Sequence, residues 1–155
     1  MAKRMDYPKA SPEVLKAMSA LEKTAKALVA DETIFELVKI RASQINGCAY
    51  CVDMHTIDAR AAGETEQRIY LLSMWREAEE LFTPRERAAL AWTESLTLVA
   101  STGVPAADFE LARSEFSEAE LANLTLLIIA INGWNRLGVG FRLEPGHHRA
   151  RVAAD

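Results

Sequence analysis

The stretch NGCAYCVDMH, residues 46–55, holds the residues whose types and spacing could do chemistry. It contains both cysteines of the chain, Cys48 and Cys51, and one of the three histidines, His55. Two thiols three residues apart can form a reversible disulfide or bind a metal, and an imidazole exchanges protons near neutral pH. The segment therefore predicts redox or metal chemistry.

A helix would bring these three side chains together. On a helix surface, Cys51 and His55 lie within about 60° and about 20° of Cys48, and the two cysteine Cα atoms are roughly 5–6 Å apart, inside the disulfide range. Gly47 indicates that the helix begins at Cys48, where free N–H groups and the helix dipole stabilise a thiolate. The helix start favours Cys48 as the reactive thiol, whereas His55 lies one turn from Cys51, so the choice stays open here.

Three interpretations of the cluster compete. The first is a dithiol redox centre. The second is a metal site with Cys48, Cys51 and His55 as ligands, although a closed zinc site needs a fourth ligand and no second CxxC stands at zinc-finger spacing. His147 and His148 are interpreted as exposed tail residues. The third interpretation is that two buried cysteines lie close by chance.

Glu36 lies twelve residues before Cys48 and adds to the cluster. It is opposite the apolar stripe of its predicted helix, where a solvated carboxylate is the ordinary outcome. Because Ile40 follows one turn later, this side is not wholly polar, and a partly buried carboxylate with a raised pKa could carry protons. Arg41 falls inside the stripe, so it either extends to the surface or pairs across an interface.

The elements that position these residues are predicted to be helices. Apolar residues recur at helical spacing, and capping signals divide the chain. Predicted helices cover residues 11–28, 31–45, 48–62, 65–79, 83–100, 105–116 and 117 to 138 or beyond. Because no segment alternates with period two, no sheet is expected. Residues 1–155 are predicted to form a single all-α domain.

Composition and charge limit the classes of binding partner and the setting that we expect for this chain. The chain has 155 residues and a net charge of −4, without the basic patch that nucleic-acid binding needs. Its first residues lack the apolar run of a secretory signal, and the longest apolar stretch, residues 124–131, is too short to span a bilayer. A reducing cytoplasm is the expected setting. The last predicted helix is apolar on many sides, which favours self-association.

Residues 36–63 resemble the core of the alkylhydroperoxidase AhpD-like proteins, within the carboxymuconolactone decarboxylase superfamily. The family pattern is a Glu, twelve residues later a Cys, then two residues, a Cys, three residues and a His. In this chain these positions are Glu36, Cys48, Cys51 and His55. The similarity continues through residues 85–98 and 130–142.

The resemblance implies an AhpD-like helical fold, assembly as a trimer or hexamer, and reduction of a hydroperoxide. It implies that Cys51 attacks the peroxide and becomes a sulfenic acid, and that Cys48 then forms a disulfide with it. It also implies a proton relay through Glu36 and His55, no bound cofactor or metal, and an external dithiol reductant such as a lipoyl group. The alternatives are a decarboxylase-like enzyme and a redox-sensing or metal-binding stress protein, although the decarboxylase branch typically lacks the cysteine pair.

Tyr50 is the point of departure from the best-known pattern. Mycobacterial-type enzymes carry a histidine between the cysteines, and a tyrosine with a reference pKa near ~10 is a poorer base at neutral pH. The rate, the peroxide and the reductant of this chain therefore need not match theirs. Trp134, Asn135 and Arg136 match the family's C-terminal segment and are expected to have structural roles.

Overall fold

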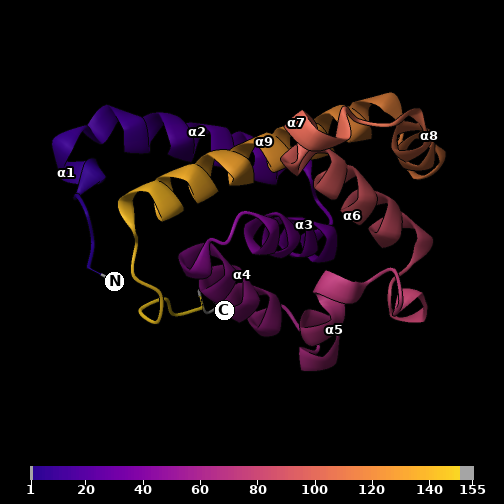
Figure 1. Ribbon diagram of the computed structural model, residues 1–155, viewed down its shortest axis with the longest axis horizontal. Coiled ribbons are helices and arrows are strands. Elements are labelled where there is room, and N and C mark those ends of the chain that lie inside the picture. The colour runs from indigo at the N-terminus through magenta and orange to yellow at the C-terminus, as the bar shows by residue number, and fades with distance from the viewer. Residues whose placement is uncertain (1, 151–155) are drawn as a thin grey trace.

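The computed structural model describes residues 2–150, and helices form all the regular secondary structure in that part of the chain (Figure 1). The predicted all-α fold is confirmed. The helices are α1 (Tyr7–Ala10), α2 (Pro12–Leu28), α3 (Glu32–Ile45), α4 (Ala49–Ala61), α5 (Glu66–Leu71), η1 (Leu72–Met74), η2 (Glu79–Leu81), α6 (Pro84–Thr97), α7 (Val99–Thr102), α8 (Ala106–Glu115) and α9 (Glu118–Phe141).

Helix α9 crosses the molecule and organises the rest. Figure 1 shows α2 running along it, with α3 and α4 below and α6 to the right, and α9 contacts all four. By length and composition α9 could cross a membrane. Its buried residues instead join α2, α3, α6 and α8 in the largest core cluster, through Leu124, Leu127 and Ile128. It is therefore the core helix of a bundle.

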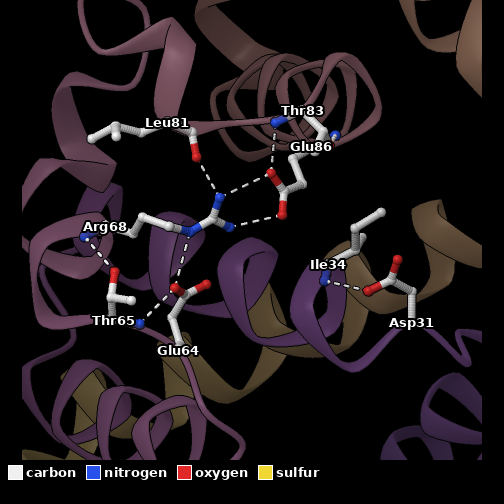
Figure 2. A network of polar contacts seen from close by, with 8 residues as sticks. All are labelled: Asp31, Ile34, Glu64, Thr65, Arg68, Leu81, Thr83 and Glu86. Atoms are coloured by element: carbon white, nitrogen blue, oxygen red, sulfur yellow. Dashed lines mark hydrogen bonds and ion pairs between the residues drawn. The ribbon is translucent and has the colours of Figure 1, made fainter.

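Three helices begin at capping residues that the sequence predicts. The Asp31 carboxylate accepts the Ile34 N–H at 3.0 Å and begins α3 (Figure 2). Thr83 and Ser117 each form a complete capping box, with Glu86 and Glu120 respectively. Because side-chain oxygens satisfy the free N–H groups of the first turn, these helices begin where the pattern predicts.

Helix α3 is buried on most of its surface. It supplies Phe35 and Val38 to the cluster around α9, Leu37 and Ile40 to a second cluster with α6, and Ala42 to a third cluster around the cysteines. A helix that contributes to three clusters has no broad solvated face. The polar residues of α3 must therefore find partners inside the protein.

The predicted helix over residues 65–79 is shorter than expected. The α-helix ends at Leu71, and a 3₁₀ turn and bends follow. Tertiary packing overrides the helical pattern here, because the tighter turn allows Leu72 and Trp75 to enter the cluster formed with α3 and α6. The indole N–H of Trp75 also donates to Glu94 at 2.9 Å.

Arg41 pairs within the chain rather than across an interface. Its Nε lies 2.7 Å from Glu94 Oε1, and both side chains are largely buried. Burial raises the pKa of Glu94, but hydrogen bonds from Arg76, Trp75 and Arg41 outweigh this effect and lower the pKa overall. The pair joins α3 to α6, so it stabilises the two helices that carry the second core cluster.

Candidate active site

Cys48 and Cys51 form a disulfide at the start of α4, with their Cα atoms 5.4 Å apart. Gly47 has φ +66°, which suits the turn between α3 and α4. Cys48 is the N-cap of α4, and its Sγ accepts the Cys51 N–H at 3.4 Å. The predicted helix start is therefore confirmed, and both sulfurs lie at the positive end of the helix dipole.

Gly138 of α9 leaves the space that the disulfide occupies. A Cβ built there would lie 2.7 Å from Cys48 Sγ and 3.5 Å from Cys51 Sγ. A larger side chain would therefore collide with the sulfurs. Glycine inside an apolar helix is itself a signal of close approach, but the sequence does not reveal which group approaches.

Glu36 and His55 form a buried hydrogen-bonded pair. Glu36 Oε2 is 2.8 Å from His55 Nδ1, and the two residues are only 7% and 4% exposed. The interpretation of Glu36 as a solvated carboxylate is therefore wrong, because α3 is enclosed on the side that carries it. The pair fixes the orientation of the imidazole and leaves its Nε2 free of Glu36.

A cavity of about 520 Å³ connects these groups. Glu36, Cys51 and His55 line it, together with Tyr50, Met54 and the α9 residues Ile131 and Trp134. Both cysteines are nearly fully buried, at 1% and 2% exposed, but only Cys51 is among the lining residues. A small molecule in this cavity would therefore meet Cys51, and not Cys48, beside the Glu36–His55 pair.

Lys39 is a buried cation in the same cavity wall, and the sequence analysis missed it. Its residue is 2% exposed, its ammonium pairs with Glu22, and it lies 4.3 Å from the centre of the Phe35 ring. Burial lowers the pKa of Lys39, although Glu22 opposes this effect. Trp134 Nε1 also donates to Glu22, at 3.1 Å. In the sequence, the position of Lys39 between the apolar residues Val38 and Ile40 is the signal that it could be buried.

Side chains of α9 also hold the loop before the cysteines. Asn135 is 1% exposed, donates to Ser43 Oγ at 2.9 Å and accepts from Asn46 Nδ2 at 2.8 Å. Asn46 lies two residues before Cys48, so this network fixes the turn that leads into α4. Arg136 is exposed and donates to the Asn132 carbonyl at 2.8 Å. Structural roles for Asn135 and Arg136 fit these contacts, whereas Trp134 also borders the cavity.

The C-terminal segment returns to the cavity. His148 lines the cavity, and its Nε2 is 2.7 Å from Asp58 Oδ1. The interpretation of His148 as an exposed tail residue is therefore wrong, whereas His147 is exposed as expected. The Gly146 N–H donates to Asp53 at 2.8 Å. These contacts hold the segment after α9 against α4 (Figure 1).

Residues 12–95, more than half of the chain, match the model of the carboxymuconolactone decarboxylase family. The chain belongs to this family. All four residues of the predicted Glu–Cys–Cys–His pattern fall inside the matched region. In this family member, Glu36, Cys51 and His55 border one cavity, and Cys48 is joined to Cys51 behind it.

Proteins similar to this family member include one from Bacillus subtilis and one of known structure from Agrobacterium tumefaciens. The uncharacterized protein YdfG of Bacillus subtilis is 45% identical over 139 residues, covering 90% of this chain and 94% of YdfG. A protein of unknown function from Agrobacterium tumefaciens, with a suggested role as the antioxidant defence protein AhpD, is 45% identical. Its TM-score is 0.91, over 95% of this chain and 100% of that chain.

A more distant structure supports the fold alone. The AhpD core of an uncharacterized peroxidase-related protein from Ralstonia eutropha JMP134 is 21% identical, with a TM-score of 0.74, over 90% of this chain and 74% of that chain. Together with the Agrobacterium structure, it confirms the predicted AhpD-like architecture.

Proposed function

We propose that this protein is a thiol-dependent peroxidase that reduces organic hydroperoxides through Cys48 and Cys51. One observation carries the proposal: a disulfide-forming cysteine, Cys51, borders the same cavity as the buried Glu36–His55 pair. A reversible dithiol supplies two electrons, and a fixed imidazole beside it supplies the proton transfer that peroxide cleavage needs.

In the first step, Cys51 gives its proton to His55, whose orientation is held by Glu36. The Cys51 thiolate attacks the terminal peroxide oxygen, the O–O bond breaks, and an S–O bond forms. The departing alkoxide takes the proton back from His55 and leaves as an alcohol. Cys51 is then a sulfenic acid, oxidised by two electrons, and the hydroperoxide has been reduced by two electrons.

In the second step, the Cys48 thiolate attacks the sulfur of the Cys51 sulfenic acid. The S–O bond breaks, the oxygen leaves as water after taking up the Cys48 proton, and the disulfide forms. An external dithiol then reduces the disulfide by exchange and is itself oxidised to a disulfide. Because Cys51 borders the cavity and Cys48 does not, we expect the dithiol to attack Cys51, with Cys48 as the leaving thiol.

The cavity supports an organic hydroperoxide as the substrate. Much of its wall is apolar, including Leu15, Phe35, Met54, Ile131 and Leu143. Burial of an alkyl group against these side chains would add affinity in proportion to the apolar area removed from water. The role suggested for the Agrobacterium relative and the peroxidase-related description of the Ralstonia protein agree with this chemistry.

We also expect the protein to self-associate and to work in the cytoplasm. Ile129 and Val139 of α9 are 54% and 45% exposed, and contacts between copies would bury such apolar side chains. A trimer or hexamer is the expected assembly, and light scattering during gel filtration would measure its mass.

The experiment compares the wild type with Cys48→Ser and Cys51→Ser. A hydroperoxide should remove both free thiols of each reduced wild-type chain, and a dithiol should restore them. We expect multiple-turnover activity to vanish in both variants, because each lacks one half of the couple. Full activity in both variants would overturn the proposal and favour a decarboxylase-like or other non-thiol enzyme.

A further inference from the structure

The cavity wall holds a cluster of metal-ligating side chains that the peroxidase uses only in part. Glu36, His55 and Asp58 each offer one oxygen or ring nitrogen, and these three atoms lie within 4.8 Å of one another. His148 contacts one member of this group, because its Nε2 is 2.7 Å from Asp58 Oδ1. Asp58 has no part in the thiol chemistry, so its place in this cluster needs another explanation.

The composition of the cluster suits a divalent transition-metal ion. One imidazole and two carboxylates are ligands that zinc and related ions accept, at roughly 2.0–2.2 Å from the metal, and three protein ligands leave a further position for water. The nearby ammonium of Lys39 pairs with Glu22, and so does not take a place among these ligands. A bound dication would compensate the two carboxylates, which lie in a partly buried site.

The ligands and the hydrogen-bond partner of Asp58 come from three segments that the fold brings together. Glu36 belongs to α3, His55 and Asp58 lie on one side of α4, and His148 lies in the segment after α9. That segment is held in place by the Gly146 N–H, which donates to Asp53 at 2.8 Å. His148 is therefore positioned by a contact that is independent of the ligands.

We infer that Glu36, His55 and Asp58 form a binding site for a divalent transition-metal ion, and that His148 orients Asp58 through its hydrogen bond. The site differs from one built on the two cysteines, because none of its ligands is a sulfur. A metal in this site would hold both Glu36 and His55, which would then be unable to relay protons. Inhibition of the enzyme by the metal is the expected consequence, and this consequence rests on the proposed function.

Isothermal titration calorimetry with Zn²⁺ tests the site on the oxidised protein, in which the disulfide removes both thiolates as ligands. We expect one zinc ion to bind per chain. Asp58→Asn and His148→Gln should each weaken binding by at least about tenfold, since loss of a ligand or its partner commonly costs that much. Asp53→Asn is the matched control, because it removes a carboxylate charge from the same helix while its amide oxygen can still accept the Gly146 N–H, and it should bind zinc like the wild type.

Two results would overturn the site. One is the absence of saturable zinc binding to the oxidised wild type, and the other is equal affinity in the Asp58→Asn and Asp53→Asn proteins. Circular dichroism of each variant verifies that it is folded. Because calorimetry needs no turnover, its failure would remove the metal site, whereas failure of the peroxidase proposal would appear in the cysteine variants.

Discussion

Two buried polar networks in this protein differ in whether they leave a polar group available to a ligand. The first surrounds Arg68, whose guanidinium donates to Glu64 at 2.9 Å, to Glu86 at 2.7 Å and 3.2 Å, and to the Leu81 carbonyl (Figure 2). The Phe82 ring lies 4.9 Å from the same group. The second network is the Glu36–His55 pair, which has one hydrogen bond between its members and borders the cavity.

The comparison separates a structural network from a chemical one. Every nitrogen of the Arg68 guanidinium has a protein partner, so the network joins α5 to α6 and has no group left for a ligand. The Glu36–His55 pair instead combines an oriented imidazole with an open space and a disulfide-forming cysteine. Burial alone does not indicate a reactive group. A buried histidine that borders a cavity and has a hydrogen-bond partner at one ring nitrogen is a candidate for one.

The largest expected effect comes from the Glu36–His55 pair. His55→Gln should lower kcat/KM for a hydroperoxide by about 10²–10⁴-fold, because it removes the group that carries the proton. Initial rates with saturating dithiol would measure this loss, and circular dichroism would verify the fold. A variant that kept a rate within a factor of three of the wild type would remove His55 from the relay.

A substitution in the Arg68 network should lower the stability of the protein and leave its activity unchanged. Arg68→Met leaves Glu64 and Glu86 without their cation while their side chains are 10% and 9% exposed. The expected cost is about 3–5 kcal/mol in the free energy of unfolding, because uncompensated carboxylates remain buried. Urea denaturation would measure it, and the specific activity of the folded variant should match the wild type.

Arg87→Met is the matched control for that experiment. Arg87 pairs with Glu79 at 2.7 Å, but the two side chains are 30% and 63% exposed. A pair in water contributes only about 0–1 kcal/mol. Equal destabilisation by the two substitutions would contradict the distinction between a buried and an exposed pair.

Glu94 should give a smaller, pH-dependent effect. Its pKa is lowered below 4.5 in the folded protein, so it adds stability above pH 4.5 that is lost as the pH falls through the lowered pKa. Glu94→Gln should therefore cost about 2 kcal/mol at pH 7, and the difference from the wild type should shrink below pH 4.5. Denaturant unfolding from pH 3.5 to 7 would measure this, and a difference that stayed constant would show that the Glu94 charge contributes nothing.

Tyr50 should give the smallest effect. Its ring packs against the cluster that contains the two cysteines, and a phenol contributes little as a base at neutral pH. Tyr50→Phe should keep the peroxidase rate within about threefold of the wild type. A loss of tenfold or more, with the fold intact, would assign the hydroxyl a part in the reaction.

Local signals predicted most of the fold. The caps at Asp31, Thr83 and Ser117 mark helix starts because each acts on its own first turn. The segment after Leu71 could not be predicted in the same way, because packing of Trp75 against other helices ends the α-helix there. Local patterns therefore fail where contacts distant in sequence decide the conformation.

The candidate site was predictable only in its central residues. The fixed spacing of the Glu–Cys–Cys–His pattern indicated Glu36 and His55, although the burial of Glu36 depends on how α3 is enclosed. Lys39, Gly138 and His148 reach the site through contacts with α2, the disulfide and α4 respectively. Such contacts join segments far apart in the chain, and no single local pattern encodes them.

Trapping of the sulfenic acid tests the central claim most directly. Reduced Cys48→Ser and Cys51→Ser proteins are each treated with one equivalent of an organic hydroperoxide in the presence of dimedone, and the adducts are located by mass spectrometry. Because Cys51 borders the cavity and Cys48 does not, we predict an adduct on Cys51 in the Cys48→Ser protein and none in the Cys51→Ser protein. An adduct on Cys48 in the Cys51→Ser protein, with none in the Cys48→Ser protein, would contradict this account.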